Sequence, residues 1–186
     1  MTVKEILITT STMLGREDVT AYLNGDVDSA GENTLPTINV MVNLLNLVIG
    51  ELAGTFIPMV KSEKISTNNG KVYYTDLTER ALEIKNVFDF SGTRVSYRQT
   101  AEFIAVACDN VIVEYEYAPP NYGLDDKIGF TEKDVALGTL AYGLAAEYSI
   151  SLEDFDQAVM WHKRYVDSIA EHRKVHNATI KERSFV

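Results

Sequence analysis

The spacing of apolar residues changes twice along this 186-residue chain, and that change constrains the fold more than any other feature. Apolar residues recur every three to four positions up to about residue 57, and they alternate with polar residues between about 60 and 118. The first spacing returns between about 131 and 172. These two spacings are typical of amphipathic helices and of half-buried strands, so we expect an α+β fold.

The same changes predict the domain boundaries. Residues 1–58 and 128–175 are expected to form one helical bundle, and residues 59–127 an inserted domain. The insert should be a small antiparallel β sandwich or barrel, because it holds roughly six short apolar runs joined by tight-turn residues. The helical spacing ends near Arg173, so residues 176–186 are expected to form a C-terminal arm.

A long apolar helix is predicted to begin at Thr34, which can cap it, with Pro36 in the first turn, where a missing N–H costs little. Its apolar residues cover more than one face, so it needs partners on more than one side. The apolar stretch 38–57 is interrupted by asparagine and glycine. We therefore expect it to be too polar to span a bilayer, and we expect no membrane partner.

Turn and strand signals are clear in the β region. Asn69-Gly70 predicts a hairpin turn, because both residues tolerate a positive φ. The run V-I-V-E-Y-E-Y, which follows a turn expected at Asp109-Asn110, alternates between two faces and predicts a strand with one buried face. That face would carry Val111, Val113, Tyr115 and Tyr117.

The run V-A-L-G-T-L-A-Y-G-L-A-A-E-Y, which starts at Val135, predicts a close-packed helix that Thr131 could cap. Its small residues would let neighbouring helices approach: Gly138, Ala141, Gly143, Ala145 and Ala146. Ser149 or Ser151 is expected to break the chain before a last helix. That helix is predicted to bury Phe155, Ala158, Val159, His162, Val166 and Ile169.

Glu147 is the one carboxylate in this apolar helix. An unpaired carboxylate in such surroundings would cost several kcal/mol, so we expect it to meet a cation or a capping group. Lys163 or Arg164 of the last helix could supply it and fix the two helices together, and an arginine of a second subunit is the alternative.

Motifs for catalysis, cofactors and metals are absent from the sequence, and we expect neither an enzyme nor a cofactor or metal site. The loop D-V-D-S-A-G-E-N-T-L-P-T resembles a calcium loop but has Thr37 where a bidentate glutamate is needed. His172 and His176 have zinc-ligand spacing without a third ligand, and His162 fits a core histidine.

The net charge of −10 argues against a general nucleic-acid coat, because phosphate binding needs clustered lysine and arginine. The single cysteine, Cys108, lies in an apolar run and fits a small buried side chain in a reducing compartment. The N-terminal segment lacks the features of a signal peptide. We therefore expect a soluble protein made in the cytoplasm.

Four segments together resemble the head–tail adaptor proteins of tailed bacteriophages, also called connector, neck or head-completion proteins. In chain order they read V-N-L-L-N-L-V-I-G-E-L, V-E-Y-E-Y-A-P-P, A-Y-G-L-A-A-E-Y and F-D-Q-A-V-M-W-H-K-R-Y. The resemblance covers about residues 36–172 and rests on packing patterns. The β insertion is larger than is usual in such adaptors, which leaves the position within the neck open.

The resemblance implies a structural virion protein that forms a ring, typically of twelve copies, beneath the portal. Its partners would be other copies of itself, the portal and a downstream neck or tail protein, and DNA would pass through the lumen without specific binding. The protein would be assembled in the host cytoplasm and would end in the virion neck. Expected interface residues are Glu147, Trp161, Arg164, Tyr165, Ile180, Arg183 and Phe185.

Two other functions stay open. One is a tail-completion or tail-terminator subunit, although such a chain would usually be richer in strands. The other is a small hydrolase-like or ligand-binding α+β domain that uses Glu147 and His162. A ring formed in the presence of portal would favour the adaptor over both.

Overall fold

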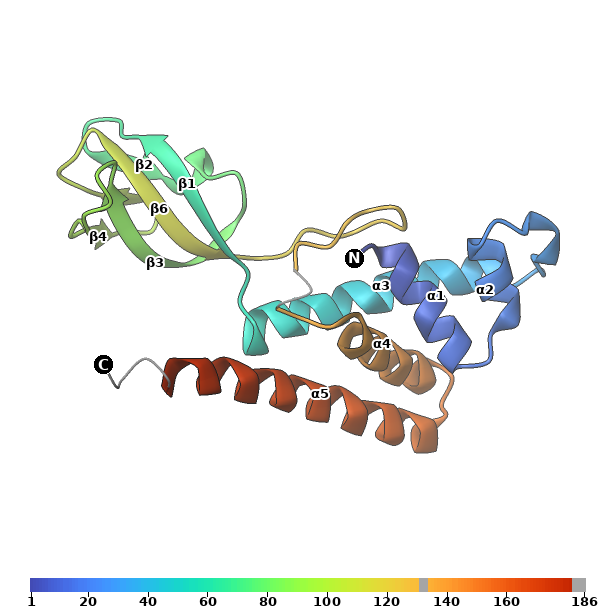
Figure 1. Ribbon diagram of the computed structural model, residues 1–186. Coiled ribbons are helices and arrows are strands. Elements are labelled where there is room, and N and C mark those ends of the chain that lie inside the picture. The colour runs from blue at the N-terminus through green and yellow to red at the C-terminus, as the bar shows by residue number, and fades with distance from the viewer. Residues whose placement is uncertain (131–133, 182–186) are drawn as a thin grey trace. The chain divides into compact units, whose positions relative to one another are not determined.

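The computed structural model describes residues 1–130 and 134–181, with side chains up to residue 171. The described residues form an α+β fold with five α-helices and two antiparallel three-stranded sheets (Figure 1). The chain divides into two compact units. The helical unit comprises Met1–Leu52 and Pro120–Val186, and the β unit comprises Ala53–Pro119.

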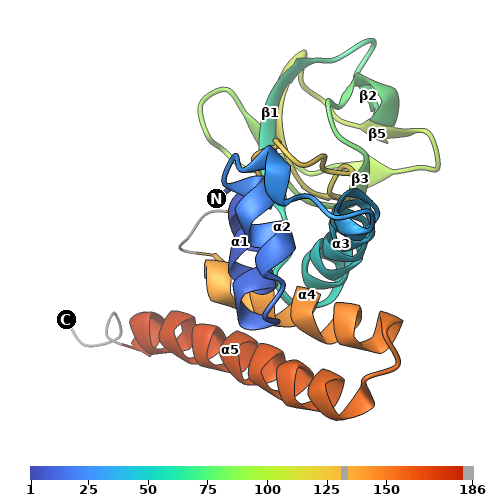
Figure 2. The ribbon, with the colours of Figure 1, turned by 90° about the vertical axis from the view of Figure 1, so that its right-hand side faces the viewer.

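The helical unit is organised around one central helix. Its helices are α1 (Val3–Met13), α2 (Glu17–Leu23), α3 (Thr34–Glu51), α4 (Leu137–Ser151) and α5 (Phe155–Lys181). Helix α4 packs against α1, α3 and α5, and it lies between α5 and the other helices (Figure 2). A short 3₁₀ turn, η1 (Val27–Ser29), joins α2 to α3, and a π-helical turn, η2 (Leu52–Phe56), follows α3.

Two helix starts differ from the sequence prediction. Helix α3 has Asn33 at its N-cap position, without a side-chain cap. The Thr34 hydroxyl instead donates to Asp18 Oδ2 at 3.0 Å and accepts from the Gly31 N–H at 3.0 Å. Helix α4 begins at Leu137, and its expected cap, Thr131, lies outside the described residues.

Helix α5 is longer than predicted. It continues past Arg173 to Lys181, so the expected end of the helix near Arg173 is wrong. The prediction relied on the loss of apolar spacing near Arg173, but backbone hydrogen bonds can continue a helix that has no apolar stripe. The rest of the expected arm, residues 182–186, lies outside the described residues.

A side-chain amide holds the chain that returns from the β unit against α3. Asn46 donates from Nδ2 to the Tyr122 carbonyl at 2.9 Å and accepts from the Tyr122 N–H at 2.8 Å. Further along the same segment, the Asp126 carbonyl accepts from the Val3 N–H at 3.1 Å. An asparagine that interrupts an apolar run in the sequence therefore satisfies backbone groups of a segment far along the chain.

The β unit consists of two sheets with strand orders β1-β6-β3 and β2-β5-β4. The strands are β1 (Val60–Ser66), β2 (Lys71–Tyr73), β3 (Ala81–Asp89), β4 (Arg98–Gln99), β5 (Phe103–Ala105) and β6 (Asn110–Tyr117). The Asn69-Gly70 turn has the expected positive φ values of 52° and 71°. However, the strands that it joins lie in different sheets, because β1 pairs along its whole length with β6.

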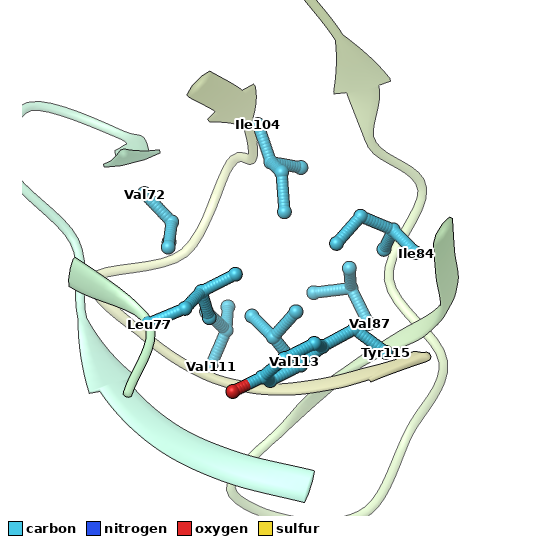
Figure 3. Close-up of a cluster of buried hydrophobic side chains, with 8 residues drawn as sticks. All are labelled: Val72, Leu77, Ile84, Val87, Ile104, Val111, Val113 and Tyr115. Carbon is cyan, nitrogen blue, oxygen red and sulfur yellow. The ribbon is translucent and has the colours of Figure 1, made fainter. Parts of the chain in front are cut away.

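Side chains from both sheets meet in the core of the β unit (Figure 3). Val111, Val113 and Tyr115 are fully buried, as the alternation along this strand predicts, and Tyr117 is half-buried. Val72 and Ile104 come from the second sheet and point toward them. Cys108 is half-buried against the same cluster.

A nearly buried carboxylate links three segments of the β unit. Glu63 of β1 accepts from the Tyr115 hydroxyl at 2.9 Å and from the Thr78 N–H at 3.0 Å, and it pairs with Lys61 at 2.9 Å. Burial by itself raises the pKa of Glu63, but these donors outweigh it and lower the pKa to about 2.

By length and composition alone, the helix that spans Thr34–Phe56 could cross a membrane, which differs from the expectation that it is too polar. Core helices of soluble proteins pass the same test. Here one face of α3 is buried in the helical unit through Ile38, Met41, Leu45, Val48 and Ile49. Its exposed face still carries Val40 and Leu47, which are 43% and 63% exposed.

The break between α4 and α5 is a Schellman turn. The Asp154 N–H donates to the Ser149 carbonyl at 3.0 Å, and the Glu153 N–H donates to the Ile150 carbonyl at 2.9 Å. Asp154, rather than Ser149 or Ser151, caps α5, because its Oδ1 accepts from the Gln157 N–H at 3.2 Å. Glu153 occupies the position that usually needs glycine, with a φ of 60°.

Replacing Glu153 with glycine is therefore expected to stabilise the helical unit by about 1 kcal/mol, because glycine adopts a positive φ without steric cost. Urea unfolding followed by the fluorescence of Trp161, the single tryptophan, measures this change. The matched control is Asp156→Gly in the first turn of α5, which should destabilise the unit. A Glu153→Gly protein less stable than wild type would contradict the strain assigned to this turn.

Candidate subunit interface

Helix α5 carries apolar residues on two faces, and the chain covers only one of them. The buried face consists of Ala158, Trp161, Tyr165 and Ile169. The second face, which we call the α5 stripe, consists of Phe155, Val159 and Val166, which are 63%, 71% and 45% exposed. The prediction that Ala158 and Ile169 are buried is confirmed, and the prediction that the α5 stripe and His162 are buried is wrong.

The two large aromatic residues explain which face is buried. Trp161 packs on Ala145 and Ala146 of α4 and stacks on Tyr142, with ring centroids 6.0 Å apart. The side chains of α4 are small there, so the indole fits against the helix, and aromatic rings bury the largest area per residue. Trp161 and Tyr165 are 7% and 2% exposed. They therefore belong to the core and not to the lateral surface that the sequence predicted.

Gly143 makes the approach of three helices possible. A Cβ atom at this position would lie 2.7 Å from Val48 Cγ1 of α3 and 3.0 Å from Tyr165 Cε2 of α5. The prediction that small residues of α4 allow close packing is therefore confirmed at Gly143. It does not hold at Gly138, where a Cβ atom would meet only Tyr142 at 3.9 Å.

The Tyr165 hydroxyl lies beside two carboxylates. It donates to Glu51 Oε2 at 3.3 Å, and Glu147 is close enough to act on it electrostatically. Burial, followed by the charges of Glu51 and Glu147, raises the pKa of Tyr165 well above its ordinary value. The hydroxyl therefore stays protonated as a donor at neutral pH.

Glu147 does not have the cation that the sequence predicted. Among the residues with described side chains it forms no ion pair, and neither Lys163 nor Arg164 pairs with it. Arg164 lies instead over the Trp161 ring, 4.9 Å from its centroid. Glu147 is half-buried, so water reaches it and the cost that motivated the prediction is reduced.

The remaining predicted residues lie at or beyond the end of the described side chains. Ile180 is in α5, but its side chain is not described, and Arg183 and Phe185 lie outside the described residues.

His162, the other residue considered for a ligand site, is exposed, with its ring centroid 6.2 Å from that of Tyr165. Within residues 1–130 and 134–171, no group of three or more potential ligands could hold a metal ion.

A polar network that the sequence did not suggest ties α2, α3 and α4 together. Arg16 binds Asp18 through two hydrogen bonds of 3.0 Å, and its guanidinium also donates to the Tyr148 hydroxyl and to Thr37 Oγ1. The hydrogen bonds from Arg16 lower the pKa of Asp18 to about 2. Arg16 and Asp18 are two residues apart, but their partners Thr37 and Tyr148 lie far along the chain, which is why the sequence does not reveal the network.

Three further apolar residues that are exposed lie near the start of the α5 stripe. Ile150 and Leu152, at the end of α4, are 47% and 60% exposed, and Met160 is 42% exposed. Scattered apolar residues are ordinary on a protein surface, but contiguous groups mark interaction sites. The α5 stripe and this turn are therefore the best candidate interface in the helical unit.

Comparison with known proteins does not decide the function. No protein-family model matches the chain, and no curated protein matches it.

Proposed function

We propose that this chain is a ring-forming structural subunit of a tailed-bacteriophage virion, which joins the portal to the tail and continues the DNA channel. The observation that carries the proposal is the α5 stripe, an apolar helix face that the chain leaves exposed. A soluble chain covers such a face by assembling with other copies or with a partner.

The resemblance to head–tail adaptors, on which the proposal also rests, involves the helices that pack around α4. Three of its four segments fall in α3, α4 and α5. These helices pack on one another where Gly143 meets Val48 and Tyr165. The packing patterns that suggested an adaptor therefore correspond to one structural frame, and the α5 stripe lies on its outermost helix.

The charge of the chain suits a channel. The net charge is −10, and like charges repel the phosphates of DNA. A ring built from such a subunit would let DNA slide through its lumen without holding it. Specific nucleic-acid binding is not part of the proposal.

Replacing Val159 with aspartate tests the proposal directly. Because Val159 is 71% exposed in the single chain, the variant should fold normally, yet its charge should prevent burial between copies. We expect wild-type protein to form a ring with purified portal, and the variant to stay monomeric, in sedimentation velocity and native mass measurements. The matched control is Leu82→Asp, an apolar residue of the β unit that is 54% exposed, which should assemble.

Two results would count against the proposal. The first is a wild-type chain that stays monomeric both alone and with portal. The second is a Val159→Asp protein that assembles as well as the wild type. Assembly with purified tails but not with portal would instead support a tail-completion subunit.

A further inference from the structure

The β unit carries a row of apolar and basic side chains on the outer face of one sheet. Lys64 of β1 and Phe88 of β3 both pair with Ile112 of β6. Phe88 also forms an isolated bridge with Arg94. Side chains of directly opposed residues lie on the same face of a sheet, so these four residues form one continuous row. The row faces away from the core, because the neighbouring Val113 of β6 points into it (Figure 3).

Phe90 extends this row, and its two cations have no acidic partner. The Lys64 Nζ atom lies 5.7 Å from the ring centroid of Phe90, which is 56% exposed. Among the residues with described side chains, neither Lys64 nor Arg94 forms an ion pair. We call these five residues the basic sheet patch: Lys64, Phe88, Phe90, Arg94 and Ile112.

Acidic side chains near the basic sheet patch are already bound to other groups. Glu114 accepts from Asn86 Nδ2 at 2.6 Å, and Glu116 pairs with Lys85 at 2.7 Å. Asp89 accepts from two backbone N–H groups of its own turn, at 2.9 Å and 2.8 Å. The patch is therefore an apolar surface with two positive charges that these carboxylates do not neutralise.

The turn between α4 and α5 has the opposite charge. Leu152 and Phe155 are 60% and 63% exposed, and the exposed Glu153 and Asp156 lie beside them in sequence. We call these four residues the acidic turn. The Schellman turn holds them in one compact segment at the edge of the helical unit (Figures 1 and 2). Lys163, the next basic residue along the chain, lies about 10 Å further along α5 than Asp156.

The two surfaces are complementary. Both combine exposed apolar side chains with charge of one sign, and the two signs are opposite. Protein interfaces bury apolar side chains at their centre and place opposite charges against one another around it. Two different surfaces of one chain that fit each other produce head-to-tail contacts, which close into rings when the rotation between copies allows it.

We infer that the acidic turn of one copy docks on the basic sheet patch of the next copy. The two apolar side chains of the turn pack on the apolar side chains of the patch, and its two carboxylates face the lysine and the arginine. The α5 stripe begins at Phe155, so this contact buries the first residue of the stripe. The inference rests on the proposed self-assembly and specifies which two surfaces form it.

Cross-linking of two different variants tests the contact. In a Cys108→Ala background, one protein carries Ser62→Cys beside Lys64, on the same face of the sheet, and the other carries Gln157→Cys beside Asp156. The charged residues of both surfaces are thus kept. Assembled together with portal, the mixture should give a covalent dimer with a short bis-maleimide. Each copy has a single cysteine, so such a link joins different copies.

The control for this experiment is Glu102→Cys in place of Ser62→Cys. Glu102 is exposed and lies between β4 and β5 of the other sheet, so this variant should give no dimer with Gln157→Cys. Dimers in equal yield from the control, or from either protein alone, overturn the inference. Assembly without a link in the mixture overturns the inference and leaves the proposed function intact. A chain that does not assemble at all overturns both.

A charge exchange tests the electrostatic part of the contact. Reversal of the sheet charges (Lys64→Glu with Arg94→Glu) should weaken self-association at least about 10-fold in sedimentation velocity, since facing like charges are unfavourable. Reversal of the turn (Glu153→Lys with Asp156→Lys) should do the same. The four changes together should restore assembly, because opposite charges again face each other.

A second control separates this local effect from net charge. Asp26→Lys with Asp28→Lys alters two exposed residues of the loop before α3 and changes the net charge as much as reversal of the turn does. Added to the reversed sheet patch, these two changes should leave assembly weak, although the net charge equals that of the restored protein. Assembly restored by this control overturns the inference. Assembly that neither reversal weakens, or that the four changes fail to restore, also overturns it.

Discussion

Replacing Gly143 with alanine is expected to destabilise the helical unit by about 2 kcal/mol. Alanine favours helix by about 1 kcal/mol over glycine, so in an open position the change would be stabilising. Here the added Cβ would lie 2.7 Å from Val48 Cγ1 and 3.0 Å from Tyr165 Cε2. Both neighbours are buried, so helices must shift to make room.

The matched control is Gly138→Ala in the same helix, where a Cβ atom meets only Tyr142 at 3.9 Å. This variant should be as stable as wild type or slightly more stable. Urea unfolding followed by Trp161 fluorescence measures both variants. A Gly143→Ala protein that equals the wild type would show that the three helices do not pack as closely as described.

A double variant tests whether crowding against Val48 causes the destabilisation expected for Gly143→Ala. Val48→Ala removes the methyl groups nearest to Gly143 and should cost about 2 kcal/mol alone. If crowding is the cause, Gly143→Ala with Val48→Ala should lose clearly less stability than the sum of the two single losses. If the two losses of stability simply add, contact with Val48 is not the cause of the destabilisation by Gly143→Ala.

Replacing Glu63 with glutamine is expected to destabilise the β unit by about 2 kcal/mol at pH 7. The side chain of Glu63 is 13% exposed and takes hydrogen bonds from Tyr115, Thr78 and Lys61. A neutral amide cannot replace a carboxylate that accepts from three donors. Hydrogen exchange of the β6 amides measures the stability of this unit separately from the helical unit.

The loss of stability in Glu63→Gln should become smaller as the pH falls. The pKa of Glu63 is lowered to about 2 in the folded protein, from roughly 4.3 in an unfolded chain. Its stabilisation is therefore complete above about pH 5 and disappears as the pH falls toward 2. The difference between wild type and Glu63→Gln should shrink over that range.

Glu83→Gln is the control for this experiment. Glu83 pairs with Lys85 at 2.9 Å, but its side chain is 62% exposed, so its removal should change stability by less than about 0.5 kcal/mol. A Glu63→Gln protein that behaves like this control would contradict the role of Glu63 as a link between strands. A difference from wild type that persists at pH 2 would contradict the assigned pKa.

Much of the fold could be predicted because local patterns survive folding. The alternation at Val111, Val113 and Tyr115 predicted a buried face, and that prediction is confirmed. The positive φ values at Asn69 and Gly70 also follow from the residue types. The pairing of β1 with β6 could not be predicted, because the partner of a strand depends on contacts between segments far apart in the chain.

The candidate interface was harder to predict from the sequence than the fold. Apolar residues of α5 fit two overlapping helical stripes, and spacing alone does not say which one is buried. The small residues of α4 receive the rings of Trp161 and Tyr165, which leaves Phe155 and Val159 exposed. The shape of the neighbouring helix α4 therefore determines which apolar face of α5 is buried.

The order of helical and β regions and the need for close packing along α4 can be read from the residues alone, since both follow from residue size and from spacing along the chain. Three features became visible only in the folded chain: the close approach of helices at Gly143, the nearly buried link at Glu63 and the exposure of the α5 stripe. They depend on folding because a side chain is buried only where two surfaces of the chain meet. A single segment does not specify which of its faces meets another.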